Sequence, residues 1–508
     1  MGFTFYPKGV AIKIKFFGKT FKTIAFLIPA ACSAVFAQWN GTASEPIEKN
    51  VIDGKVFYTI TSAEELTWVG VQVKNGFNGI NVVLANDIVF GADSSQTSSR
   101  LWTPIGKDTT TAYAGTFDGA GHTIYGYYVE QGTFAGLFGA LSPDGVIKNL
   151  RVANNKVTVT EASATAGGIV AFNRGLVDNC ENSGTVDVTT KAYAAGGVAG
   201  INEGVVSNSS NYGSVTSKTT MTSEGGFENG TRAGGIVSFN QYGKVFDCVN
   251  HGDVVAATVL VPIDIDNDCI AGGIAGGNEG SLYRNFNDGS IIFRNSYNNS
   301  GTNMKFTSTG GIVGRNLGFV ERSSNWGNII AKIASTSTKA GTSSYSTAGG
   351  VVGASRGTVS DVFNTGSVTV TKVATASYAG GILGSLFGSE KLTNSYNASS
   401  NITGTLIGAV SAYITESSHV QNCHYDASLF STKTPAIKSV GGSATVKDTS
   451  GLKTDNMKSD EMAWILNTVN NTEKNRKLWG REDSYPVFAN ESVKPISRVT
   501  MNNDGEEL

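Results

Sequence analysis

Short apolar and polar runs alternate along most of this chain, and the pattern recurs at a nearly fixed interval. Runs of about four to six residues rich in Val and Ile are separated by Gly or by Asn-x-Gly, as in segments 167–186 and 196–215. Such runs are too short for helices, and β-branched residues between Gly and Asn turns are typical of strands. The pattern therefore predicts an all-β protein.

Copies of one motif fill the region between residues 167 and 399. Each copy has two glycines, three apolar or small residues, a Gly-x-Val step and an Asn-x-Gly turn. The copies begin at Gly167, Gly196, Gly234, Gly272, Gly310, Gly349 and Gly380. Their spacing of 29 to 39 residues indicates a solenoid. We expect each copy to form one coil of a right-handed parallel β-helix, with coils about 4.8 Å apart.

The aligned copies place the same residue types in columns, with one residue per coil. The asparagine of the Asn-x-Gly turn recurs as Asn182, Asn211, Asn250, Asn287, Asn325, Asn364 and Asn397. An asparagine amide can bond to the amide of the next coil, so we expect a structural ladder. The glycine two positions later is expected to supply a positive φ at the turn.

Another column contains charged residues in four of its coils. Asp247 lies one coil before Arg284, and Arg322 lies one coil before Asp361. Opposite charges on adjacent strands attract each other, so the column predicts two lateral ion pairs. The alternative is a catalytic carboxylate beside a substrate-binding arginine.

Both ends of the chain depart from the repeat pattern. Residues 62–73 combine a capping box with an apolar face, and residues 459–470 form a second amphipathic segment. Because an open coil would expose core and unpaired backbone, we expect these short helices to cap the solenoid at each end. The predicted organisation is a signal peptide (1–37), a lead-in and cap (38–128), the parallel β-helix (129–430), a C-terminal cap with a closing strand at 478–488 (431–488) and a flexible tail (489–508).

The first 37 residues have the features of a secretory signal peptide. Five lysines and no acidic residue precede an apolar run at 23–36, which is too short to span a membrane. No later stretch approaches that length, so we expect the mature chain outside the cell or at its surface, without a membrane-spanning segment. The mature chain would carry 34 Lys and Arg against 41 Asp and Glu, which disfavours a nucleic-acid partner.

Cysteines and acidic residues give no support for a metal or cofactor. Cys180 and Cys248 share a column two coils apart, about 9.6 Å, which is too far for a disulfide. They are expected to be buried apolar groups, and no CxxC pair suggests zinc. Asp264, Asp266 and Asp268 alternate like calcium ligands, but the turn glycine and the twelfth-position Glu of such a loop are missing.

Two regions are candidates for ligand binding. The residue at the centre of the Asn-x-Gly turn carries a ring at Tyr212, His251 and Trp326, and exposed ring faces can stack on sugars. The second candidate is the set of Ser/Thr/Asn-rich arms between copies, because insertions map to one edge of a solenoid. The alternatives are rings that only shield a turn and arms that are solvated spacers.

The segment 136–152 and the GGIVGxNxGxV copies resemble the GLUG motif family of exported bacterial proteins. The segments YTITSAEEL, NDIVF and FDGAGHTI are similar to the lead-in of such proteins, so the resemblance covers roughly residues 56–488. It implies an extracellular or cell-surface β-helix, often adhesive, and assigns no catalytic residues. The motif also occurs beside a zinc peptidase in streptococcal immunoglobulin A proteases. That enzyme needs His-Glu-x-x-His, and none of the 4 histidines here precedes Glu.

The favoured function is a non-catalytic surface protein that displays loops for adhesion or glycan binding, with a polysaccharide or a host or cell-surface glycan as its partner. The first alternative is a β-helix polysaccharide lyase or glycoside hydrolase, which would gather carboxylates or a Lys or Arg base on one face; the coil faces here carry Ser, Thr and Asn. The second alternative is an ice-binding solenoid. It needs regular Thr-x-Thr ranks, which occur at 157–160 and 368–371 but not in the coils between them.

Overall fold

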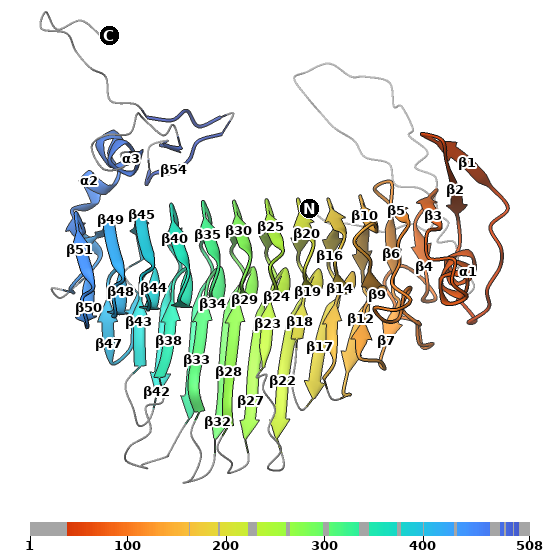
Figure 1. Ribbon diagram of the computed structural model, residues 1–508, viewed down its shortest axis with the longest axis horizontal. Coiled ribbons are helices and arrows are strands. Elements are labelled where there is room, and N and C mark those ends of the chain that lie inside the picture. The colour runs from red at the N-terminus through yellow and green to blue at the C-terminus, as the bar shows by residue number, and fades with distance from the viewer. Residues whose placement is uncertain are drawn as a thin grey trace, which may run out of the picture.

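The computed structural model describes residues 38–161, 163–190, 194–221, 231–260, 265–297, 304–334, 345–372, 377–399, 401–430, 434–467, 478–481, 484–490 and 492–496. Short strands fill most of this chain and stack in parallel, coil upon coil, into one continuous solenoid (Figure 1). The predicted all-β parallel β-helix is confirmed. The predicted signal peptide lies outside the described residues.

Sheet 1 receives two short strands from most coils. Its first row contains β2 (Lys55–Ile60), β3 (Asn81–Leu84), β5 (Thr116–Asp118), β10 (Val146–Lys148), β15 (Leu176–Asp178), β20 (Val205–Ser207), β25 (Lys244–Phe246), β30 (Ser281–Tyr283), β35 (Phe319–Glu321), β40 (Thr358–Ser360), β45 (Lys391–Asn397), β49 (His419–Asp426) and β51 (Thr445–Lys447). Its second row contains β4 (Ile88–Val89), β6 (Thr123–Tyr125), β11 (Arg151–Ala153), β16 (Glu181–Asn182), β21 (Ser210–Asn211), β26 (Val249–Asn250), β31 (Phe286–Asn287), β36 (Ser324–Asn325), β41 (Phe363–Asn364) and β52 (Ser450–Leu452).

Three further sheets complete each coil. Sheet 2 contains β7 (Tyr128–Val129), β12 (Lys156–Val159), β17 (Thr185–Thr190), β22 (Val215–Met221), β27 (Val254–Leu260), β32 (Ile291–Tyr297), β37 (Ile329–Ala334), β42 (Val368–Lys372) and β46 (Ile402–Thr403). Sheet 3 contains β8 (Phe134–Ala135), β13 (Thr165–Gly167), β18 (Ala194–Gly196), β23 (Arg232–Gly234), β28 (Ile265–Gly272), β33 (Met304–Gly310), β38 (Tyr345–Gly349), β43 (Ser377–Gly380) and β47 (Leu406–Gly408). Sheet 4 contains β9 (Phe138–Leu141), β14 (Val170–Asn173), β19 (Ala199–Asn202), β24 (Val237–Asn240), β29 (Ala275–Asn278), β34 (Val313–Asn316), β39 (Val352–Ser355), β44 (Leu383–Leu386), β48 (Ser411–Ile414) and β50 (Ile437–Val440).

Columns of aliphatic side chains fill the core. The column that follows the paired glycines is buried throughout and consists of Ile169, Val198, Ile236, Ile274, Ile312, Val351 and Ile382. A second column, in the first row of sheet 1, consists of Val177, Val206, Val245, Leu282, Val320, Val359 and Leu392. Each coil thus buries apolar area against its neighbours on both sides, which is the main stabilising contribution in a solenoid.

The turn asparagines form a continuous hydrogen-bonded ladder inside the solenoid. From Asn182 to Asn397, each Nδ2 donates to Oδ1 of the asparagine in the next coil over 2.7 to 3.1 Å. The same nitrogen donates to the carbonyl oxygen two residues ahead, as from Asn250 to Gly252 over 2.8 Å. All these ladder side chains are fully buried. A second ladder runs from Asn173 and ends at the Ser355 hydroxyl.

The turn glycines do not supply a positive φ, contrary to expectation. Positive φ occurs instead in the column that contains Asp247, Arg284, Arg322 and Asp361, which we name the charged column; φ is 55° for Asp247 and 53° for Arg284. The glycines are required for a different reason, which is the close approach of neighbouring coils. A Cβ on Gly252 would lie 2.0 Å from the carbonyl oxygen of Gly213.

The helix α1 (Ala63–Lys74) covers the N-terminal end of the core, as predicted (Figure 1). Ser62 caps it, because its hydroxyl accepts a hydrogen bond from the backbone N–H of Glu65 over 3.2 Å. Leu66 and Val69 on its inner face have no exposed surface. The amphipathic pattern therefore places this helix over the first strands of the stack.

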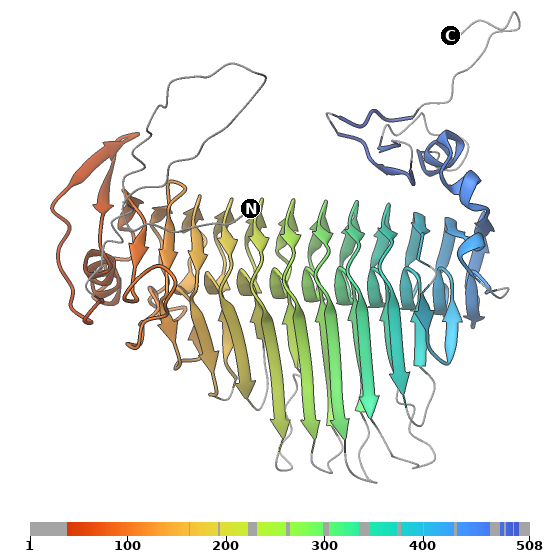
Figure 2. The same ribbon diagram turned by 180° about the vertical axis from the view of Figure 1, so that it is seen from behind.

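Two short helices at the C-terminal end, α2 (Thr454–Met457) and α3 (Asp460–Asn467), lie on the flank of the last coils (Figure 2). They cover the stacked rings of Phe363 and Tyr396, whose centroids are 5.1 Å apart. The final strands β50, β51 and β52 remain largely exposed, and Val440 shows 53% of its surface. A helix is thus present at this end, but outward-facing aromatic rings direct it to the flank.

The C-terminal cap differs from the sequence prediction in two details. The segment 478–488 forms two short antiparallel strands, β53 (Trp479–Gly480) and β54 (Val487–Phe488), where one closing strand was expected. Part of the predicted flexible tail packs against this pair: Val493 is 7% exposed, and the Ile496 N–H donates to β53 over 2.9 Å. The reason is that Ile496, an apolar residue within the polar tail, packs against the hydrophobic cluster that contains Trp479.

Strand pairing continues beyond both predicted limits of the β-helix, residues 129 and 430. Upstream, β10 pairs with β5, β5 with β3 and β3 with β2. Downstream, β49 pairs with β51 and β52. These outer strands lack the Asn-x-Gly signature. They still extend the stack, because strands pair through backbone hydrogen bonds whatever their side chains are.

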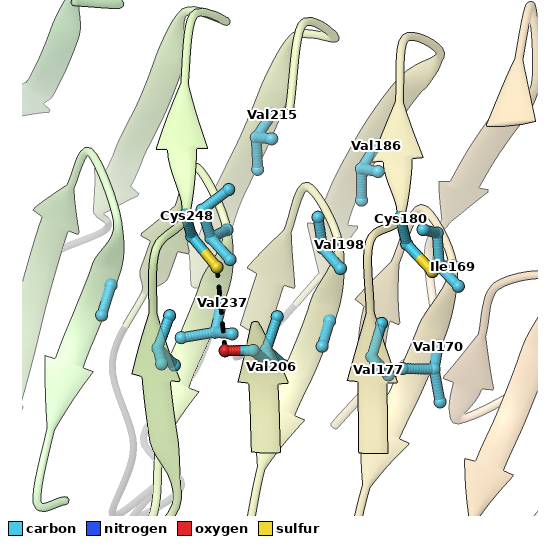
Figure 3. Close-up of a cluster of buried hydrophobic side chains, with 14 of the residues drawn as sticks. Ile169, Val170, Val177, Cys180, Val186, Val198, Val206, Val215, Val237 and Cys248 are labelled. Carbon is cyan, nitrogen blue, oxygen red and sulfur yellow. Dashed lines mark hydrogen bonds between the residues drawn. The ribbon is translucent and has the colours of Figure 1, made fainter. Parts of the chain in front are cut away.

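Cys180 and Cys248 are free thiols buried among aliphatic side chains (Figure 3). The Sγ of Cys248 lies 3.7 Å from the carbonyl oxygen of Val206, to which it donates. Burial raises the pKa of both thiols, and of the Cys423 thiol, to about 12. They behave as small apolar groups, in line with their predicted role.

We expect the thiols of Cys180, Cys248 and Cys423 to be inert in the folded protein. The thiolate is the reactive form, and a pKa of about 12 leaves almost none of it near neutral pH. A chromogenic disulfide reagent should label these residues only after unfolding in guanidinium chloride, as located by peptide mass spectrometry. Rapid labelling of any of the three in the native protein would contradict their burial.

Candidate functional site

Four consecutive coils present Tyr212, His251, Asp288 and Trp326 at the same turn position, which we name the turn row. Each residue directly follows a ladder asparagine. Its backbone N–H donates to the ladder asparagine carbonyl of the preceding coil over 2.8 to 3.0 Å. Because the ladder side chain points into the core, the next side chain points out. The ladder therefore holds the turn row at a regular spacing along one edge.

The structure brings part of the turn row into direct contact. The rings of Tyr212 and His251 stack with centroids 4.5 Å apart and planes 20° apart. His251 Nδ1 lies 2.8 Å from Asp288 Oδ1. Trp326 packs edge-on against Phe286 at 5.4 Å. Tyr212 and Trp326 still expose 52% and 54% of their surface, so both offer an apolar face to solvent.

The charged column contains one of the two predicted ion pairs. Arg284 donates to both carboxylate oxygens of Asp247 over 2.6 and 2.5 Å, and its guanidinium lies 4.2 Å from the Tyr283 ring centroid. This contact is lateral pairing between neighbouring coils, as the sequence suggested.

The second predicted ion pair, between Arg322 and Asp361, is not found among the described residues, and both side chains contact other groups. Arg322 lies 3.3 Å from Glu321 and donates to the Tyr283 hydroxyl, while Asp361 accepts from the Trp479 indole over 3.3 Å. The physical reason is that the C-terminal cap covers Asp361, which is 1% exposed. Its partner from the cap could not be read from the repeat alone.

The variable arms leave the core as extended strands. In sheet 2, β22, β27 and β32 each have 7 residues, whereas β12 has 4 and β46 has 2. Figure 2 shows these longer strands projecting below the central coils. The tips at 222–230, 261–264, 298–303 and 335–344 lie outside the described residues, so the predicted binding role of the arms remains a prediction.

An open groove of about 430 Å³ lies between sheets 3 and 4 over the later coils, and sequence reasoning missed it. Its floor in sheet 4 is the register column Arg315, Ala354, Ser385 and Tyr413. Ala354 and Ser385 are small, whereas Arg315 and Tyr413 at the two ends are large. Two small side chains between two large ones leave the groove about two coils long.

Aromatic and charged side chains line the walls of the groove. The ring of Tyr413 lies 5.5 Å from that of Tyr378 in sheet 3 and 5.9 Å from that of Phe387. The Arg356 guanidinium lies 5.6 Å from the Phe387 ring centroid and 3.7 Å from Glu416. The groove therefore combines flat apolar surfaces with charge at its rim.

A sequence signal for the groove exists at the sixth residue of each copy. This position reads Phe172, Ile201, Phe239, Gly277, Arg315, Ala354 and Ser385. Three bulky apolar residues are followed by one glycine, one arginine and two small residues. The repeat motif does not specify the residue at this position, so the motif alone does not reveal the change.

A second hollow, of about 590 Å³, lies beside α1 and is lined by Lys74, Arg100 and Lys107. Trp39 and Trp102 also line it, but both are only 4% exposed and pack against each other at 6.1 Å. The hollow is thus a seam within the N-terminal cap, with its rings committed to packing.

No metal site or membrane helix is found in the described part of the chain. None of its groups of His, Cys, Asp and Glu could hold a metal ion. Of the calcium-like run, Asp264 lies outside the described residues, and the next residues belong to the strand β28. Among the helices of the described residues, none has the length and apolar character needed to cross a membrane.

Comparison with curated proteins finds partial similarity, and no family model matches the chain. A stretch of 151 residues is 29% identical to a protein of Evansella cellulosilytica provisionally named a Gly-rich membrane protein, and covers 29% of this chain and 16% of that protein. A stretch of 108 residues is 35% identical to halomucin of Haloquadratum walsbyi, and covers 20% of this chain and 1% of halomucin. The chain thus spans less than a fifth of the length of either relative.

Among solved structures, a crystal structure of a protein from Bacteroides ovatus, provisionally assigned as an immunoglobulin A1 protease, is similar to this chain. The alignment covers 87% of this chain and 95% of that chain, with 16% identity and a TM-score of 0.38. Membership of the GLUG motif family therefore stays a prediction that rests on the motif residues.

Proposed function

We propose that this repeat protein is a non-catalytic, exported protein of the GLUG type that binds glycans along the turn row. The observation that carries the proposal is the exposure of the Tyr212 and Trp326 rings at equivalent positions of one rigid edge. A pyranose presents an apolar face with a polar rim, so such rings can pack on it while neighbouring polar groups bond its hydroxyls. The His251–Asp288 pair lies between the two rings and offers those polar groups.

The pairing of two outward carboxylates supports the non-catalytic part of the proposal. A glycoside hydrolase commonly needs two carboxyl groups about 5 to 9.5 Å apart across a substrate. Here Asp247 is bonded to Arg284, and Glu203 lies 3.1 Å from Arg174. These groups are committed to lateral pairing. The alternative, a polysaccharide lyase or hydrolase, would show itself as released unsaturated sugars or reducing ends on incubation with the purified chain.

Export to the cell surface or the medium is the second part of the proposal. The basic and apolar pattern of residues 1–37 supports it. The relative provisionally named a Gly-rich membrane protein is consistent with a location at the cell envelope. Rigid solenoids display the same turn many times along one edge, which suits binding to a repeating polymer.

We expect the double variant Tyr212→Ala, Trp326→Ala to retain less than about a tenth of wild-type binding to an insoluble polysaccharide that the wild type retains. Each lost stacking contact costs about 0.5 to 1.5 kcal/mol beyond area burial, and 1.4 kcal/mol is tenfold in affinity. The measurement is a pull-down across a panel of insoluble glycans, with circular dichroism melting to verify folding.

The matched control is Tyr242→Ala, Phe319→Ala, which removes two rings that are 75% and 62% exposed outside the turn row. This control should bind like the wild type. Equal binding by the turn-row variant and the wild type, with equal melting curves, would remove the turn row from the proposal.

A further inference from the structure

Two of the three charged side chains that line the groove between sheets 3 and 4, among the described residues, are positive. Its charged lining among the described residues consists of Arg315, Arg356 and Glu416. Arg315 rises from the groove floor and is half-buried. Burial lowers the pKa of its guanidinium, and the positive charges of Arg232 and Arg356 lower it further. A negative group placed in the groove would be attracted to the guanidinium groups of Arg315 and Arg356.

A polar group on the groove floor also lacks a partner. The Ser385 side chain is fully buried, and its Oγ has no hydrogen-bond partner among the described residues. Burying a hydroxyl group without a hydrogen-bond partner costs free energy. A ligand that reached the floor could supply the missing bond.

We propose that this groove binds an acidic sugar unit of a polysaccharide through its carboxylate, at a site distinct from the turn row. Arg315 receives the carboxylate, because the planar fork of a guanidinium matches its two oxygens. The faces of Tyr378 and Tyr413 pack against the sugar ring. Ser385 on the floor bonds a ring hydroxyl.

The shape of the groove favours one sugar unit within a chain over a free small anion. The groove is open, so that a polymer can enter and leave it, and it runs across the coils between Arg315 and Tyr413. Glu416 at the rim, 3.7 Å from Arg356, would repel a densely charged ligand. This arrangement fits a sugar unit that carries one carboxylate better than a highly sulfated sugar unit.

The test is calorimetric titration of the purified chain with oligosaccharides of three kinds. One set carries carboxylates (oligogalacturonate, oligoalginate and hyaluronate fragments), one carries sulfates (sulfated galactan fragments) and one is neutral (maltooligosaccharides). We expect binding to at least one carboxylated probe, weakening with salt as screening predicts. Arg315→Gln should weaken that binding at least about tenfold, since a charge-assisted bond is worth about 1.5 to 3 kcal/mol.

Arg174→Gln is the matched control. Arg174 occupies the rim position of an earlier coil equivalent to that of Arg356, and its guanidinium lies 4.9 Å from the Phe172 ring centroid. The control removes the same charge from the same surface outside the groove, and binding should be unchanged. A second variant, Ala354→Phe, fills the groove without changing its charge and should also abolish binding.

Four outcomes would overturn the proposal. They are no binding to any carboxylated probe, tighter binding to the sulfated or neutral probes, equal losses for Arg315→Gln and Arg174→Gln, and full binding by a folded Ala354→Phe. The turn-row variant Tyr212→Ala, Trp326→Ala should keep wild-type affinity for the acidic probe. The groove and the turn row can therefore succeed or fail independently.

Discussion

Replacing Gly252 by alanine is expected to lower the free energy of unfolding by about 3 kcal/mol. The added Cβ would lie 2.0 Å from the carbonyl oxygen of Gly213 and 2.8 Å from the Nδ2 of Asn211. Neither neighbour can move freely, because Asn211 Nδ2 donates to that same carbonyl over 2.8 Å. The methyl group must therefore push two coils apart or break a rung of the ladder.

The matched control is Gly79→Ala, because nothing lies within 4 Å of the position where its Cβ would be, and its φ is not positive. Alanine there should be neutral or slightly stabilising, since it restricts the unfolded chain. Urea unfolding followed by circular dichroism measures both variants. Equal midpoints for the two would show that the coils tolerate a side chain at the turn.

The repeat predicts what recurs in every coil. An asparagine such as Asn250 appears in each copy at the same place, and its chemistry allows it to bond its own kind in the coils before and after it. Glycine allows two explanations, positive φ or close approach, and the sequence alone does not separate them. At Gly252 the close approach requires glycine, while the positive φ falls on residues such as Asp247 and Arg284.

Features that depend on departures from the repeat are harder to predict. The groove needs Ala354 and Ser385 in sheet 4 beside Tyr378 in sheet 3, and these positions become neighbours only when two sheets meet at a corner. The flank position of the C-terminal helices depends on Phe363 and Tyr396, where early coils have Glu181 and Ser210 in the same register column. A change of residue type within a column thus marks a surface that contacts something other than solvent.

Asn250→Ala should destabilise the protein by at least about 2 kcal/mol, because a buried polar group left without its partner costs about 1 to 3 kcal/mol. The Asn250 amide donates to Gly252 and to Asn287 and accepts from Asn211, over 2.8, 2.8 and 2.9 Å. Alanine removes all three hydrogen bonds. Water cannot replace them, because the Asn250 side chain is fully buried.

The same substitution at Asn328 provides the comparison. Asn328 is exposed and lies three residues after the ladder residue Asn325, so that its bonds to Ser367 can be replaced by water. Asn328→Ala should change stability by no more than about 0.5 kcal/mol. The urea midpoint should therefore fall clearly for Asn250→Ala and hardly at all for Asn328→Ala. Similar small shifts for both would mean that the ladder follows from the stacking of the coils and contributes little to their stability.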